Sequence, residues 1–260
     1  MTSYFQVPSE SPSLDVRTLR LLIGCIAIGL AVLVQAVSPL PLTSISGSYF
    51  SGDWPRNFFV GCLFFIACFM IAYNGKLQIE AWLSKAAALA AIGVAVFPCD
   101  CAVEATRRGA KTLQCLGINV DLYSRLGHCT TQVQEISGAH GASAFVMFGI
   151  LAVFCYIFYK RAKAKEDERR TASRRRMRVY SIALTLIVVA IIALLVNRLF
   201  DGVISQAWPT FVFWGEFVGL VSFGASWLTA SYTIPGMAHE QRERFHPLRR
   251  AKPAQPIPQQ

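Results

Sequence analysis

Six long apolar stretches separated by polar segments constrain this chain more than any other feature of its sequence. A helix crosses the hydrocarbon core of a bilayer with roughly 20 apolar residues, and each stretch approaches that length. The predicted spans are residues 21–37, 57–73, 81–97, 138–159, 179–199 and 210–232. We therefore predict an all-α fold, a polytopic transmembrane bundle of six helices within residues 19–235.

The distribution of charge supports this fold class and excludes others. Of the 260 residues, 54% are hydrophobic and only 15% are charged, whereas a soluble domain averages about 25% charged residues. The formal net charge is +10, but recognition of nucleic acid needs a basic face on a folded soluble domain. Because the Lys and Arg residues of this chain flank apolar stretches instead, we predict no nucleic-acid partner.

The positions of Lys and Arg predict the orientation of the bundle. With the N-terminus inside, the inner segments contain 19 of the 25 Lys and Arg residues and the outer segments contain six. This bias follows the positive-inside rule and places both termini in the cytoplasm of a multi-pass cell-membrane protein. A cleaved signal peptide over the first span is the less favoured alternative, since the polar region before it is long.

Three segments flank or divide the predicted bundle on its cytoplasmic side. Residues 1–18 form a disordered tail in this prediction, and residues 236–260 form a basic, Pro-rich tail. Residues 160–178 form a basic loop with ten Lys and Arg residues against three acidic ones. That loop could hold anionic lipid headgroups, although its role as a determinant of topology is the simpler interpretation.

A long outer loop, residues 99–137, contains half of the eight cysteines. An outer loop meets an oxidising compartment, where disulfides persist. We therefore predict that two disulfides brace the loop, with the pairing left open. A metal site that includes His128 is the rival interpretation, but the spacing does not match that of zinc sites, and no metal is predicted. The cysteines concerned are Cys99, Cys101, Cys115 and Cys129.

Small residues predict close packing in two of the spans. The third span is rich in Ala and Gly between residues 86 and 95, which is typical of a helix that packs against neighbouring helices. In the sixth span, Gly215 and Gly219 form a G-x-x-x-G motif. Glycines at this spacing allow helices to approach closely, so we interpret the motif as a packing device.

Several polar residues are expected at one depth near the outer ends of the spans. Ionisable groups within a span are costly and often functional. His140 in the fourth span and Glu216 in the sixth are the main candidates, because a carboxylate can orient an imidazole for acid–base chemistry. The alternative is that these groups only tie helices together. The other candidates at this depth are Asp53, Arg56, Asn57, Asn197, Arg198 and Asp201.

Four short motifs resemble those of a known family. They are Ser44-Ile45-Ser46, Phe97-Pro98, His140-Gly141-Ala142 and Trp214-Gly215-Glu216. Over residues 40–232 the chain resembles the DRAM/Sfk/Frag-like six-helix membrane proteins, and also bacterial hypothetical membrane proteins of the same outline. The resemblance implies lipid handling, with Ser44, Ser46, His140 and Glu216 as functional positions. The family commonly has Trp where this chain has Phe217, and the Cys-rich loop is a further departure.

These observations predict a protein that binds, senses or helps to handle a membrane lipid through an outer-side polar pocket. The first alternative is a membrane-embedded lipid-modifying enzyme, a hydrolase or a transferase, with His140 as base and Glu216 or Asp53 as its partner. The second is a scaffold subunit, for which another membrane protein would be the partner. Since the chain has none of the common nucleotide, zinc-protease or serine-hydrolase motifs, we predict no cofactor.

Overall fold

The computed structural model describes residues 15–38, 41–51, 53–75, 77–99, 132–164, 170–200 and 202–232. Within these ranges, six helices are long and apolar enough to cross a membrane, so all six predicted spans are confirmed. A 3-10 helix, η1 (Ser46–Phe50), and a short helix, α8 (Val203–Ala207), connect them. The six long helices are α1 (Val16–Val37), α2 (Asp53–Ala72), α3 (Gln78–Val96), α6 (Gln132–Lys163), α7 (Arg170–Leu199) and α9 (Phe211–Ala230).

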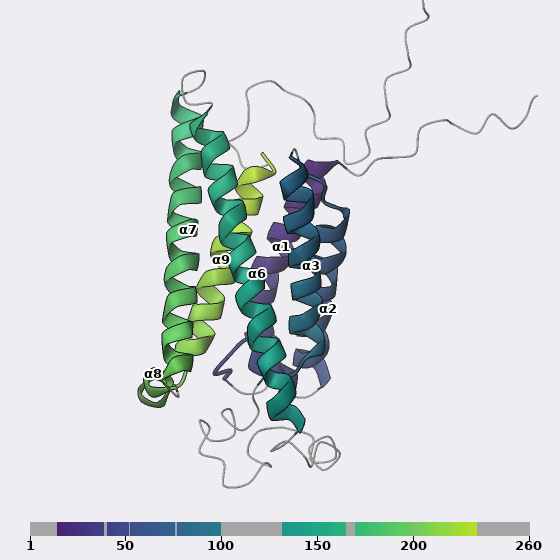
Figure 1. The fold of residues 1–260 in the computed structure, drawn as a ribbon, viewed down its shortest axis with the longest axis vertical. Coiled ribbons are helices and arrows are strands. Elements are labelled where there is room, and N and C mark those ends of the chain that lie inside the picture. The colour runs from purple at the N-terminus through teal and green to yellow at the C-terminus, as the bar shows by residue number, and fades with distance from the viewer. Residues whose placement is uncertain are drawn as a thin grey trace, which may run out of the picture.

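The six long helices form a closed ring in chain order (Figure 1). Each packs against its neighbours in the sequence, and the ring closes where α1 packs along α9. Helices α1, α3 and α7 run in one direction and α2, α6 and α9 run in the other. The start of α1, the end of α6, the start of α7 and the end of α9 therefore lie at the same end of the bundle, which we call the basic end.

Three predicted boundaries need correction. Helix α1 starts at Val16 and so extends into the predicted tail of residues 1–18. Most of the predicted basic loop 160–178 is helical, because α6 continues to Lys163 and α7 begins at Arg170. Helix α6 also begins at Gln132, inside the predicted outer loop 99–137. Hydropathy marks where apolar side chains stop, but Lys, Arg, Gln and Ala are strong helix formers and continue a helix beyond that point.

Small residues bring the helices into close contact. A Cβ atom added to Gly24 of α1 would lie 2.9 Å from the carbonyl oxygen of Gly224 in α9, so the two backbones touch there. The predicted packing role of the G-x-x-x-G motif is confirmed. A Cβ atom at Gly215 would lie 2.8 Å from Leu194 of α7, and one at Gly219 would lie 2.6 Å from Phe148 of α6. Such contacts drive association of helices in lipid.

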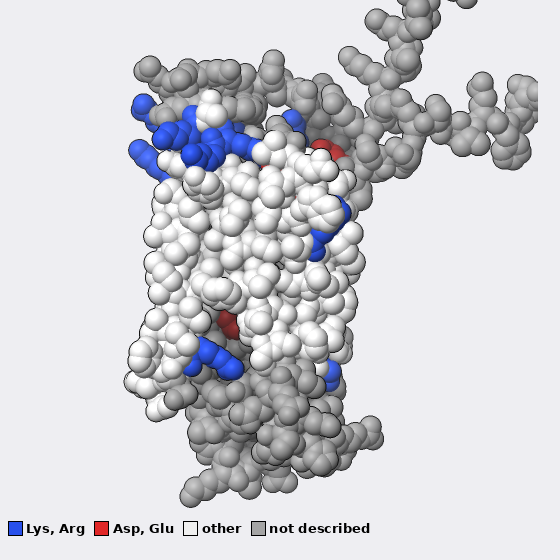
Figure 2. All heavy atoms as spheres, in the orientation of Figure 1, with Lys and Arg blue, Asp and Glu red and all other residues white. Residues whose placement is uncertain are grey.

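The outer surface of the ring is apolar between its two ends. Large apolar side chains point away from the bundle on different helices; Phe65, Leu89 and Ile182 are 60%, 72% and 60% exposed. Figure 2 shows that Lys and Arg side chains gather over α6 and α7 at the basic end, whereas the middle of this face is almost free of charge. An apolar belt with charges at its edges is the surface expected of a protein that spans a bilayer.

Candidate functional site

At the end opposite the basic end, the carboxylate of Glu216 binds the segment between α1 and α2. Its Oε2 atom accepts hydrogen bonds from the backbone N–H groups of Ile45 (2.5 Å) and Ser46 (3.3 Å) and from the Ser44 hydroxyl (3.0 Å). Its Oε1 atom accepts one from the Ser46 hydroxyl at 2.7 Å. The structure thus brings together Ser44, Ser46 and Glu216, three of the residues that the sequence indicated.

This cluster has the character of a structural connection. Two backbone N–H groups and two hydroxyls direct their hydrogen bonds to one carboxylate, and Ser44 and Ser46 are themselves buried. The Gly47 N–H group donates in turn to the Ser44 hydroxyl at 3.1 Å. Buried polar groups in native proteins are paired in this way. Glu216 therefore accepts the hydrogen bonds of the turn that leads into η1 and connects this turn to α9.

His140 makes a different contact from the one predicted. It is 6% exposed, and its Nδ1 atom lies 2.8 Å from the backbone carbonyl oxygen of Phe97, just beyond the end of α3. The last carbonyls of a helix have no partner within the helix, so His140 can cap α3 from the neighbouring α6. The described contacts of His140 do not include a carboxylate, which leaves its pairing with Glu216 or Asp53 without support in the described residues.

The remaining predicted site residues are scattered. The Arg56 guanidinium donates to the Tyr49 hydroxyl at 3.1 Å and lies over the same ring. Asn57 and Arg198 are exposed, whereas Asn197 is buried and bonded to Ser205. The Asp53 side chain and Asp201 lie outside the described residues. No predicted ligand pocket is assembled from these groups by the contacts that the structure describes.

The cysteine prediction is tested only in part. The Cys99 thiol donates to the backbone carbonyl of Ser46 at 3.5 Å, next to the Glu216 cluster. Cys101, Cys115 and Cys129 lie outside the described residues. No two of the five described cysteines form a disulfide. The two disulfides of the outer loop therefore stay a prediction.

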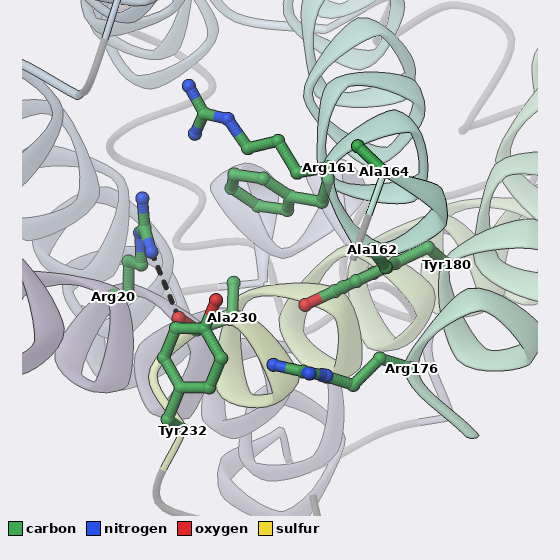
Figure 3. A pocket seen from close by; sticks show the side chains of 9 residues that line it. Arg20, Arg161, Ala162, Ala164, Arg176, Tyr180, Ala230 and Tyr232 are labelled. Atoms are coloured by element: carbon green, nitrogen blue, oxygen red, sulfur yellow. Dashed lines mark hydrogen bonds between the residues drawn. The ribbon is translucent and has the colours of Figure 1, made fainter. Parts of the chain in front are cut away.

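The basic end contains a cavity that sequence reasoning missed. Its volume is about 240 Å³, far more than the roughly 10–15 Å³ that one water needs. We call it the arginine cavity. Figure 3 shows that its guanidinium groups come from three helices, Arg20 from α1, Arg161 from α6 and Arg176 from α7. The other lining residues are Phe158, Ala162, Ala164, Tyr180, Ala230 and Tyr232.

Arg20 is held in place by its surroundings. It is 5% exposed, and its Nη1 atom donates to the carbonyl oxygen of Ala230 at 3.0 Å, the contact dashed in Figure 3. Its Nη2 atom donates to the Tyr73 hydroxyl at 2.8 Å. The guanidinium carbon lies 5.3 Å from the centre of the Phe158 ring, within the range of a cation–π contact. Only Nε has no hydrogen-bond partner among the described residues.

Arg161 is neutralised by a buried carboxylate. The side chain of Glu80, at the start of α3, is completely buried, and both of its oxygens accept hydrogen bonds from the Arg161 guanidinium. The Tyr73 hydroxyl also donates to Glu80, at 3.3 Å. Gly75 has a φ of +63°, and a Cβ atom there would lie 2.6 Å from the Glu80 side chain. A glycine is therefore required for the turn that places Glu80.

Arg176 has no comparable partner. It is only 2% exposed, yet its Nε and Nη2 atoms have no hydrogen-bond partner among the described residues. The face of the Tyr232 ring lies 5.0 Å from its guanidinium carbon. One turn earlier on α7, the Ser173 hydroxyl donates to the Ala162 carbonyl at 2.5 Å and fixes α7 against α6. Buried donors without hydrogen bonds are costly, so these two nitrogens require an acceptor.

A weak signal for this site exists in the sequence. Arg20 lies at the edge of the first predicted span, and Arg161 and Arg176 lie in the basic segment between the fourth and fifth spans. Glu80 lies at the edge of the third. Arginines at the ends of spans are expected from topology alone, so none of these residues marks a site by itself. All four belong to the same predicted end of the bundle, and that shared depth was the available signal.

The six spans, the Glu216 cluster and the arginine cavity define a polytopic helical membrane protein with buried charged residues at its basic end. The model of the family DUF998, whose members are proteins of unknown function, matches residues 35–233. The chain therefore belongs to that family. No curated protein and no solved structure matched the chain. The matched range includes Glu80, Arg161, Arg176 and Glu216, but not Arg20.

Proposed function

We propose that the protein binds the anionic headgroup of a membrane lipid in the arginine cavity. The observation that carries this proposal is Arg176, a buried guanidinium with two nitrogens that lack partners in the described chain. An anion in the cavity would complete those hydrogen bonds and offset the buried charge. Hydrogen bonds between a guanidinium and a phosphate are among the strongest in proteins because both groups are charged.

The location of the cavity favours a lipid as the source of the anion. Its lining residues include Arg20 near the start of α1 and Ala230 at the end of α9, and these helix ends lie at the basic end (Figure 1). The ends of membrane-spanning helices are the level expected for lipid headgroups. The surrounding Lys and Arg residues in Figure 2 would concentrate anionic headgroups at this end. By the positive-inside rule, we assign this end to the cytoplasmic leaflet.

The proposal keeps the predicted class of function but moves its place. The polar residues of the spans predicted a lipid pocket near Glu216, whose carboxylate already accepts four hydrogen bonds. The arginine cavity is at the other end of the bundle. The resemblance to DRAM/Sfk/Frag-like proteins, whose members are linked to lipid handling, agrees with a lipid-binding role at either end.

The proposal is tested with two variants that remove the same charge from α7. Arg176→Gln removes the buried guanidinium, whereas Arg175→Gln removes an exposed neighbour. Native mass spectrometry of the purified proteins, titrated with phosphatidylglycerol, would measure lipid retention. We expect wild type and Arg175→Gln to retain the lipid and Arg176→Gln to bind it roughly tenfold to a hundredfold more weakly. Equal retention by both variants would contradict the proposal.

A further inference from the structure

The balance of charge in the arginine cavity indicates what kind of anion it takes. Three guanidinium groups line the cavity, and one carboxylate, Glu80, is bonded to one of them. Among the lining residues and Glu80, two positive charges are therefore not neutralised. They belong to Arg20 and Arg176, which are 5% and 2% exposed. A single negative charge would leave one buried guanidinium uncompensated, whereas a dianion would neutralise both.

The unpaired donors come from different walls of the cavity. Arg20 lines the cavity from α1 and Arg176 lines it from α7 (Figure 3). Each has buried nitrogens without a hydrogen-bond partner among the described residues, Nε in Arg20 and both Nε and Nη2 in Arg176. One group can satisfy both walls only if it presents several acceptor oxygens in different directions. A phosphomonoester has three terminal oxygens and carries about −1.5 to −2 charges at pH 7. A phosphodiester has two such oxygens, one charge and two bulky substituents.

The size of the cavity agrees with a headgroup rather than a whole ligand. Pockets for drug-sized molecules occupy about 300–1,000 Å³, and this cavity has about 240 Å³. A terminal phosphate with one substituent could enter it with its oxygens inward and its substituent toward the open side. A diester phosphate, flanked by substituents on both sides, would need room in two directions.

Tyr232 adds a feature that is common at ligand sites. Its φ is +60°, in the left-handed region that bulky residues rarely adopt. This conformation places its ring beside two guanidinium groups, 5.0 Å from that of Arg176 and 5.9 Å from that of Arg17. Residues in such backbone conformations cluster at ligand clamps, where the surrounding structure maintains them. Tyr232 thus closes the side of the cavity next to the end of α9.

From the charge, the donors and the size together, we infer that the arginine cavity selects a dianionic phosphomonoester. This inference rests on the proposed function and narrows it to one chemical class. The phosphomonoester can belong to a lipid, as in phosphatidic acid, or to a soluble metabolite with the same terminal group. Both sources present the same three oxygens to Arg20 and Arg176.

The experiment compares two lipids with identical acyl chains. Wild-type protein in phosphatidylcholine nanodiscs is titrated with phosphatidic acid, a phosphomonoester, and with phosphatidylglycerol, a phosphodiester. We expect phosphatidic acid to bind about tenfold more tightly or better, as neutralising a second charge would give. Arg176→Gln should lose this preference, and Arg175→Gln should keep it. Arg176→Lys, which keeps the charge but not the planar fork, serves as a second variant if Arg176→Gln does not fold.

The outcomes separate the inference from the proposed function. If both lipids bind equally and through Arg176, the phosphomonoester inference is wrong and the proposed function stands. If neither lipid depends on Arg176, both are wrong. Competition with glycerol 3-phosphate identifies the source: displacement of phosphatidic acid at similar concentrations supports a soluble phosphomonoester, and no displacement supports the lipid. Either result of the competition keeps the inferred chemical class.

Discussion

Ser46 of η1 and Glu216 of α9 are 170 residues apart in the sequence, yet the serine hydroxyl donates to the carboxylate at 2.7 Å. The same carboxylate accepts two backbone N–H groups from the turn at Ile45 and Ser46. This contact joins the connection between the first two helices to the last one. It lies at the end of the bundle opposite the arginine cavity.

We expect Glu216→Ala to destabilise the protein by about 1–3 kcal/mol, because it leaves two backbone N–H groups of the Ile45–Ser46 turn without an acceptor. Thermal unfolding in detergent would show this as a lower midpoint. Glu216→Gln, which retains one carbonyl acceptor, should lose less. If Glu216→Ala instead binds lipid more weakly and its unfolding midpoint stays unchanged, the structural role is contradicted. That result would favour the pocket predicted near this residue.

His140→Ala should also act on stability. The substitution removes the hydrogen bond between the His140 imidazole and the Phe97 carbonyl, a partly buried contact, and the loss of such a bond costs about 0.5–1.5 kcal/mol. His140→Asn, whose amide can still donate, should recover part of the loss in a thermal unfolding measurement. If His140→Ala instead folds with an unchanged midpoint and abolishes conversion of a lipid, the alternative of a lipid-modifying enzyme would be correct.

Glu80→Gln should have opposite effects on folding and on anion binding. It removes the carboxylate that neutralises Arg161, and because the Arg161 side chain is 27% exposed the loss of these charged hydrogen bonds should cost about 1.5–3 kcal/mol. The same change leaves a third positive charge beside the cavity, so phosphatidic acid should bind more tightly. Adding this lipid should therefore raise the unfolding midpoint of Glu80→Gln by more than it raises that of wild type. Lys85→Gln, an exposed change on the same helix, is the control. Weaker binding by Glu80→Gln would show that the ion pair shapes the cavity rather than limiting its charge.

Gly24→Ala tests the closure of the ring. An added methyl group would meet the carbonyl oxygen of Gly224 and the Leu228 side chain, so α1 and α9 must separate. We expect a loss of about 1–3 kcal/mol, as for other overpacked contacts. Gly29→Ala on the same helix meets nothing within 4 Å and should be neutral or slightly stabilising. Equal effects of the two variants on thermal unfolding would mean that the close approach of α1 and α9 is not needed for stability.

The sequence by itself determined the six spans, the close-packing role of the Gly215–Gly219 motif and the segregation of charge toward one end of the bundle. These features are local. Hydropathy, residue size and the number of Lys and Arg residues beside each span can be read from short windows, and the bilayer imposes the same requirement on every span. Three of the four residues that the family resemblance selected, Ser44, Ser46 and Glu216, also meet in the fold.

Only the tertiary structure decided which polar residues share a site. His140 and Glu216 were expected to pair from their similar depth, but depth does not specify which faces of two helices meet. Arg20, Arg161, Arg176 and Glu80 come from four helices and lie together because the ring closes between α1 and α9 and because α3 packs beside α6. Such contacts depend on the rotation of each helix about its own axis. The close packing of small residues sets this rotation, and hydropathy does not encode it.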